Sequence, residues 1–204
     1  MSCVYVVATQ VDGVVDQRTE HAIRVAESMG MPIHLLIFAA CERVDMRGFA
    51  THPSLTAITI LVNPCFATPQ AEQMAAAWGA HMKDKSVHAV LMTQGVDALN
   101  VLPRIAADLA AEVLTYVTRF TRSSNAVEQQ FSRRQPACST TVLAWPCVLS
   151  VMPAEAMVVS PPVSDVRVSV DVVLVDAVPA TGLTAEPAMV APNASLSQAN
   201  VVVG

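Results

Sequence analysis

The chain has 204 residues, of which 53% are hydrophobic and 14% charged, and its net charge is −5. Lysine occurs only at Lys83 and Lys85 and the arginines are scattered, which argues against a surface that follows nucleic-acid phosphates. No apolar run reaches the ~20 residues of a membrane-spanning helix, so the high apolar content indicates a buried sheet, a large partner interface, or both.

The first half of the chain alternates strand and helix patterns. Uninterrupted apolar runs predict buried strands, and turn residues separate them. Between the first two runs, residues 16–29 carry apolar side chains at helical spacing, and Gly30 and Pro32 end this helix. Continuous apolar strands that alternate with helices are typical of a parallel sheet covered on both faces. The predicted strands are 3–8, 33–39, 57–62 and 87–92.

Two more helices are predicted in this half. Thr68 and Pro69 indicate the start of the second, with the threonine as its cap and the proline in first position. The third follows the fourth strand and is capped by either Asp97 or Asn100, and with Asn100 as the cap Pro103 falls in the first turn. The expected buried stripes are Met74, Ala75, Trp78 and Met82 on the second helix, and Leu102, Ile105, Ala106 and Leu109 on the third.

The second half carries strand patterns with no helix between them. We predict an α/β fold: a Rossmann-like parallel sheet flanked by helices, with additional antiparallel strands in the second half. Residues 1–178 are expected to form one domain. Residues 179–204 are expected to form a Pro/Ala/Ser-rich linker or arm that is disordered in isolation and ends in the start of a strand at 199–203. The strand candidates of the second half are 113–120, 126–131, 140–144, 148–151 and 166–175.

Motifs that carry chemistry are missing from the sequence. The five cysteines form no CxxC pair and are expected to be free thiols in a reducing compartment, with Cys138 and Cys147 as small buried hydrophobic residues. The histidines share no metal-binding spacing, and the seven glycines form neither GxGxxG nor a phosphate loop. We therefore predict no catalytic residue, no metal site and no cofactor-binding residue in this chain.

The sequence of the third predicted helix also resembles a motif of a known family. Leu102, Pro103, Arg104, Ala106 and Leu109 reproduce the Leu-Pro-Arg-x-Ala-x-x-Leu pattern of the N-terminal domain of the electron transfer flavoprotein alpha subunit. Other segments are similar to the family in the right order, over residues 3 to 160 and again at 199–203. The chain is identified on these motifs as similar to that N-terminal domain, without the C-terminal FAD-binding domain.

Two segments depart from the family pattern. Residues 131–141 stand where the family has Phe-x-Arg-Pro-x-Tyr-Ala-Gly-Asn-Ala. Arg133 and Ala137 agree, whereas Arg134, Pro136, Cys138 and Ser139 replace the family's Pro, Tyr, Gly and Asn. Residues 148–153 resemble a family strand that ends in Thr-Val-Arg-Pro, with Met152 in place of the arginine. A function that the family places on residues 131–141 is therefore not carried over to this chain.

The resemblance implies a first domain that packs on the beta subunit, whereas FAD belongs to a following domain or to a partner. The residues weighed as partner or anion contacts are Arg104, Arg133 and Arg134, each with a plain structural or solvated alternative. We expect a non-catalytic, scaffold-type subunit that associates with a beta-like partner or a larger respiratory assembly in the mitochondrial matrix, or alternatively in the bacterial cytoplasm. Two alternatives stay open: part of a working electron carrier whose FAD domain is on another chain or truncated, and an adenine-nucleotide-binding domain.

Overall fold

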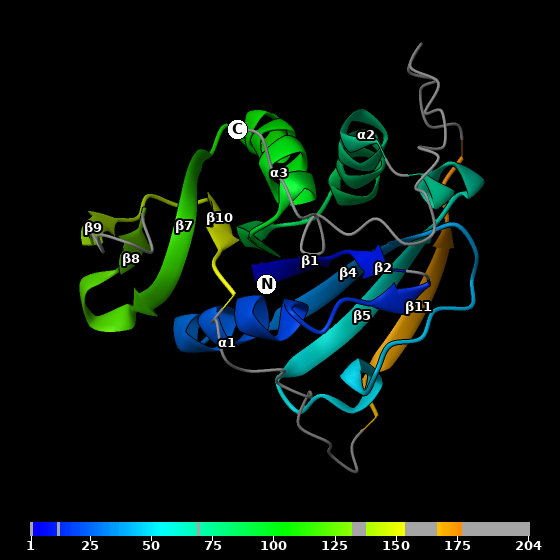
Figure 1. The fold of residues 1–204 in the computed structure, drawn as a ribbon, viewed down its shortest axis with the longest axis horizontal. Coiled ribbons are helices and arrows are strands. Elements are labelled where there is room, and N and C mark those ends of the chain that lie inside the picture. Colours follow the sequence, from blue (N-terminus) through cyan, green and yellow to red (C-terminus); the bar gives the residue numbers. More distant parts are fainter. Residues whose placement is uncertain (1, 12, 69, 132–137, 154–166, 177–204) are drawn as a thin grey trace, which may run out of the picture.

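The computed structural model describes residues 2–11, 13–68, 70–131, 138–153 and 167–176. Within these ranges, nine strands form one sheet in the order β11-β5-β4-β1-β6-β10-β7-β8-β9, as Figure 1 shows, and β2 and β3 form a small hairpin. The strands are β1 Cys3–Ala8, β2 Gln10–Val11, β3 Val14–Val15, β4 Ile33–Ala39, β5 Leu55–Val62, β6 Val87–Thr93, β7 Glu112–Thr121, β8 Ala126–Gln130, β9 Cys138–Val142, β10 Cys147–Val151 and β11 Ser169–Leu174.

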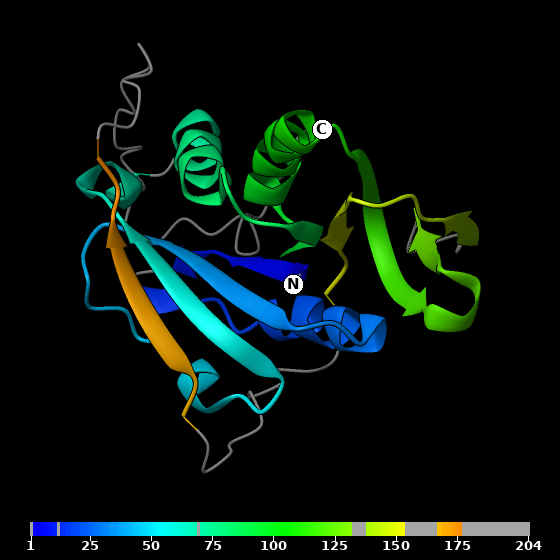
Figure 2. The same cartoon turned by 180° about the vertical axis from the view of Figure 1, so that it is seen from behind.

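Helices cover both faces of this sheet, as the continuous apolar strands predicted. Helix α1 lies on one face, and α2 and α3 lie side by side on the other (Figures 1 and 2). Residues of β1 alternate between the two layers, because Val4 and Val6 pack on the α1 side and Tyr5 and Val7 on the α2 side. The helices are α1 Thr19–Met29, α2 Ala71–Met82 and α3 Val96–Leu109, and the short 3-10 helices are η1 Phe49–Thr51, η2 Pro64–Ala67 and η3 Arg122–Ser124.

The predicted antiparallel additions are β8 and β9, which follow β7 as a meander at one end of the sheet. The other strands of the second half are parallel to the main sheet. β10 is fully buried between β6 and β7, and β11 extends the opposite end of the sheet beside β5 (Figure 2). A missing helical pattern between two segments therefore did not indicate a hairpin, because β10 follows β9 after a short connection and still pairs with β6 and β7 in parallel.

The predicted starts of all three helices differ from the structure: α1 begins at Thr19 rather than at residue 16, and both predicted caps are wrong. Asn63 caps η2 and Thr68 follows its last residue, whereas α2 begins at Ala71 after Gln70; Pro69 lies outside the described residues. Helix α3 begins at Val96 directly after Gly95, with neither predicted side-chain cap. The α3 error arises because short polar residues that favour a cap, such as Asp97 and Asn100, also fit the surface of a helix. The predicted buried stripes are confirmed, apart from Leu109, which is half-buried.

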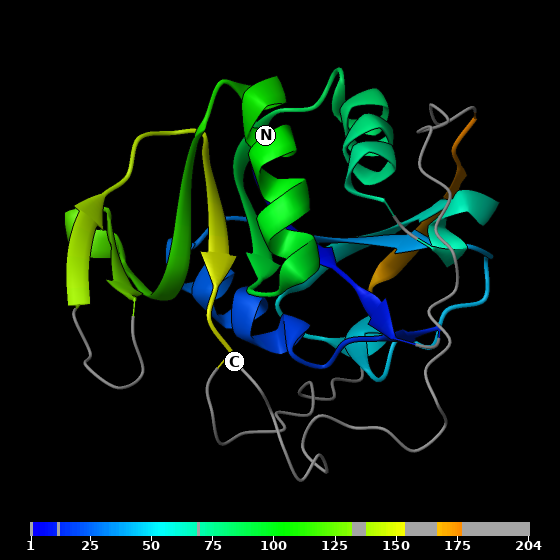
Figure 3. The same cartoon turned by 45° about the horizontal axis from the view of Figure 1, so that its top comes forward.

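Proline and tyrosine conformations shape two of these elements. Pro103 lies inside α3 rather than in its first turn, and its ring is exposed. Because proline has no amide hydrogen, it cannot donate the helical hydrogen bond to the carbonyl of Leu99. In β7, Tyr116 has a positive φ of 59°, and the register shifts between Val117 and Arg119. This bulge bends β7, so that its second half leaves β10, pairs with β8 and passes α1 (Figure 3).

Candidate functional site

The carboxyl ends of β1, β4 and β6 form the crevice in which open α/β sheets bind ligands. The chain moves from β1 to β4 on one side and returns to β6 on the other, so the strand order reverses at β1. A hollow of about 250 Å³ lies here, and Thr9, Gln10 and Asp97 are among the residues that line it. Helix α3 starts directly after β6 at this edge, with Gly95 before its first turn.

Polar groups at this edge are engaged within the protein. Gln10 Nε2 donates a hydrogen bond to the Phe38 carbonyl at 2.8 Å, and Thr93 Oγ1 donates to the Arg18 carbonyl at 2.9 Å. The Ser150 hydroxyl donates to Gln94 Oε1. The crevice is therefore held together by its own side chains.

Charge at the start of α3 also disfavours a phosphate. Asp97 stands in the first turn and lines the hollow, so its carboxylate occupies the end of the helix dipole that would attract an anion. Arg18 lies 2.6 Å from Asp16, and this hydrogen-bonded carboxylate raises the pKa of the guanidinium, with Asp97 acting in the same direction. These residues do not fit the phosphates of a flavin or another dinucleotide.

Arg104 lies on the exposed side of α3 and contacts a neighbouring helix. Its guanidinium donates to Glu72 of α2 and to the carbonyl of Asn100, the latter at 2.6 Å. Arg133 and Arg134 lie outside the described residues. Arg104 is therefore the predicted contact residue whose surroundings the structure describes.

Exposed apolar side chains lie beside Arg104. Val96 is 75% exposed and Leu99 47% exposed, and Pro103 continues the row at helical spacing. These three residues and Arg104 form the surface that we term the α3 face. Its sequence includes part of the Leu-Pro-Arg motif.

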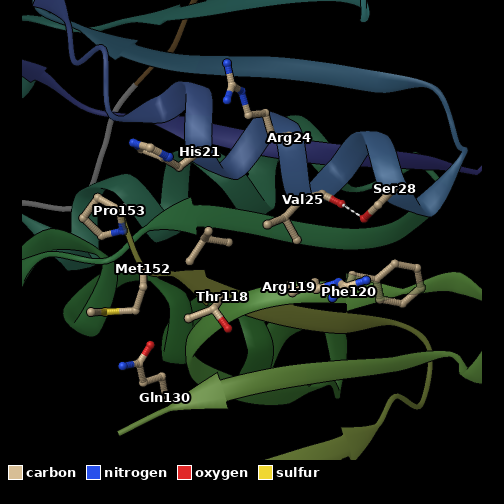
Figure 4. Close-up of a pocket in the computed structure, with 11 residues that line it drawn as sticks. His21, Arg24, Val25, Ser28, Thr118, Arg119, Phe120, Gln130, Met152 and Pro153 are labelled. Carbon is tan, nitrogen blue, oxygen red and sulfur yellow. Dashed lines mark hydrogen bonds between the residues drawn. The ribbon is translucent and has the colours of Figure 1, made fainter. Parts of the chain in front are cut away.

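A larger cavity lies between α1 and the bent half of β7 (Figure 4). Its volume is about 720 Å³, and the end of β10 closes it on one side. The lining residues are His21, Arg24, Val25, Ser28, Thr118, Arg119, Phe120, Gln130, Val151, Met152 and Pro153. Met152, which replaces the family arginine, lines this cavity, so this departure from the family pattern changes the cavity wall.

The most buried polar cluster was not predicted from the sequence. Glu20 on α1 and His52 after η1 are both buried, with His52 Nε2 3.0 Å from Glu20 Oε2. Arg24 Nε donates to the other carboxylate oxygen at 3.1 Å. Only the helical spacing of Glu20 and Arg24 is visible in the sequence, because His52 lies between two predicted strands, 33–39 and 57–62, outside every predicted element.

The cysteines show that one burial prediction is right and one is wrong. Cys147 is buried in β10, and burial together with the charge of Glu112 raises its pKa to about 12. Cys138 is exposed, because it begins the outermost strand β9. No group of three or more metal-ligating side chains occurs among the residues that the structure describes.

The sequence matches the family model of the electron transfer flavoprotein domain over residues 4–178. The chain belongs to the electron transfer flavoprotein domain family. This is a family of electron-transfer domains rather than of classical enzymes, and its members work in complexes with partner subunits. No curated protein matches the chain. In the described part of the chain, none of the helices is long and apolar enough to cross a membrane.

Proposed function

We propose that this chain is a non-catalytic, scaffold-type member of its family, which acts by association with a beta-like subunit or within a larger respiratory assembly. The observation that carries the proposal is the α3 face, where Val96, Leu99 and Pro103 are exposed to solvent beside the Arg104–Glu72 pair. Exposed apolar side chains that are rimmed by polar groups are typical of protein interfaces. The mitochondrial matrix is the compartment that we propose for this assembly.

The chemistry of the carboxyl-end crevice supports a role without a cofactor in this chain. Asp97 places a negative charge at the α3 N-terminus, and Gln10, Thr93 and Ser150 are hydrogen-bonded to other parts of the protein. A site for FAD or an adenine nucleotide needs the opposite arrangement, with free amide groups and a cation facing the phosphates. We therefore propose that any flavin in the complex is bound by the partner.

Co-purification of native partners tests the association. The tagged full chain is recovered gently from native material, and partners are identified by mass spectrometry. Leu99→Glu is the test variant, and Val142→Glu on β9, where Val142 is 68% exposed, is the matched control at another exposed apolar position. We expect Leu99→Glu to reduce recovery of a beta-like partner at least about tenfold, because an interface must desolvate the new charge, and Val142→Glu to retain it.

Equal recovery with both variants would show that the α3 face is not the contact. Circular dichroism of both variants confirms that they fold, since each replaced side chain is exposed in the wild-type structure. Recovery of the chain without a family partner and outside any larger complex would contradict the proposed function as a whole.

A further inference from the structure

The cavity between α1 and β7 has the size and lining of a small-molecule site. Its volume of about 720 Å³ lies within the ~300–1,000 Å³ typical of ligand pockets. One wall is a single face of α1, on which Val25 and Ser28 stand one turn apart. The opposite wall is the half of β7 that follows the bulge at Tyr116, including Thr118 and Arg119. Figure 4 shows Thr118, Gln130 and Met152 across the opening from α1.

The lining divides into an apolar part and a polar, basic part. Val25, Phe120 and Val151 are buried, and Met152 and Pro153 extend this apolar surface. Among the described residues, the side chains that line the cavity include cationic and neutral groups but no carboxylate. A ligand of matching chemistry has an apolar body and a negative charge.

Arg119 is the cation that is available to such a ligand. Its guanidinium makes neither a hydrogen bond nor an ion pair with any side chain in the described ranges, although Glu128 is its cross-strand neighbour. Arg24 differs, because its Nε donates to Glu20 and its guanidinium points away from β7 in Figure 4. Arg24 is thus paired with a carboxylate, whereas Arg119 is not paired with a side chain in the described ranges.

We propose that this cavity binds a small organic anion, with its carboxylate or phosphate group on Arg119 and its apolar body against Val25, Phe120 and Met152. Guanidinium pairs well with both anion types, because its planar donors match two oxygens at once. The site lies on α1, β7 and the end of β10, whereas the α3 face is on the other side of the sheet. Ligand binding here is therefore independent of the proposed partner contact.

Calorimetric titration of the full chain with three probes tests the site. The probes are 1-naphthyl phosphate, which has both features, inorganic phosphate, which has only the charge, and 1-naphthol, which has only the apolar body. We expect saturable one-to-one binding of 1-naphthyl phosphate, and weaker binding of the other two. Arg119→Gln should weaken 1-naphthyl phosphate binding about tenfold or more, as expected for loss of a charge-assisted pair.

Two further variants separate the cavity from unspecific binding. Arg47→Gln removes an exposed guanidinium that pairs with Asp45 outside the cavity, and it should leave the affinity unchanged. Ser28→Trp places a large ring at the exposed mouth and should abolish binding of all probes. No saturable binding, or equal loss in Arg119→Gln and Arg47→Gln, would overturn the proposal. Binding of a Glu-rich peptide but not of 1-naphthyl phosphate would also overturn it, in favour of a protein ligand.

Discussion

His52 Nε2 lies 3.0 Å from Glu20 Oε2, although 32 positions separate the two residues and both side chains are buried. The other ring nitrogen of His52 accepts a hydrogen bond from the Ser54 amide at 3.2 Å. The ring proton is therefore on Nε2, which donates a hydrogen bond to the carboxylate. This contact fixes the segment after η1 against the first turn of α1. It links two parts of the chain that the sequence pattern treats as unrelated.

Loss of this contact should cost much stability. We expect His52→Ala to lower the free energy of unfolding by about 3 kcal/mol, because it leaves a buried carboxylate oxygen without its donor and opens a cavity. Urea unfolding followed by circular dichroism measures the change. Asp45→Ala, which breaks the exposed pair with Arg47, is the control and should cost less than about 1 kcal/mol. Similar losses in the two variants would show that burial of the histidine contact contributes little.

Gly30 and Gly79 should respond to alanine in opposite directions. Gly30 ends α1 at a φ of 69°, and a Cβ there would also overlap the guanidinium of Arg122, so Gly30→Ala should destabilise the protein by about 1–2 kcal/mol. Gly79 lies inside α2, where a Cβ would stand 3.2 Å from Oδ2 of the exposed Asp108 side chain, which can move. Gly79→Ala should therefore be neutral or stabilise by up to about 1 kcal/mol. Thermal unfolding of both variants would contradict this account if their melting temperatures moved in the same direction.

The stacked rings of His88 and Trp145 provide an optical reporter. Their centroids lie 3.9 Å apart, and burial lowers the pKa of His88 below its usual 6.5. Because the folded value is below the unfolded one, the unfolded state takes up this proton first as pH falls, and His88 reduces stability below about pH 6.5. Tryptophan fluorescence should change with a midpoint below 6.5 in wild type and lose this transition in His88→Gln. A midpoint above 6.5 would contradict the burial of this ring.

Cys147 should make stability fall at high pH. Its folded pKa is about 12 because the thiol is buried and lies near Glu112, whereas an unfolded thiol titrates near 9. The stabilising effect is complete below about pH 9 and is lost as pH rises toward 12, since only the unfolded state releases the proton over this range. Cys147→Ala should have a shallower decline in unfolding free energy from pH 9 upward. In wild type at pH 8, a thiol reagent should label the exposed Cys41 and Cys138 well before Cys147.

Apolar runs and helical spacing predicted the buried strands and helices of the first half of the chain. The bounds of β1 and β4 follow from apolar runs that are buried on both faces, and the third helix follows from the spacing of Leu102, Ile105 and Ala106. Strand direction in the second half was harder to predict. β10 lies inside the sheet and β11 lies at its edge, and nothing in their own residues indicates which neighbour they pair with.

The candidate sites were less predictable than the fold. Arg104 was singled out by its motif, and the structure adds its contact with Glu72, which is 32 positions away. The cavity beside Arg119 was missed, because its walls come from α1, β7 and β10, and their meeting depends on the bend at Tyr116. A positive φ at a tyrosine has no sequence signature. The pair of Glu20 and His52 also has no sequence signature, because the fold brings together residues that are 32 positions apart.

Flavin content per chain is the most direct test of the central claim, which is that this domain associates with partners and holds no flavin itself. The full chain is purified alone and as the native complex, and the absorbance near 450 nm and the FAD released by denaturation are measured in both samples. We predict no stoichiometric flavin with the chain alone, and flavin in the complex only where the partner carries it. One FAD per chain in the sample without partners would contradict the account.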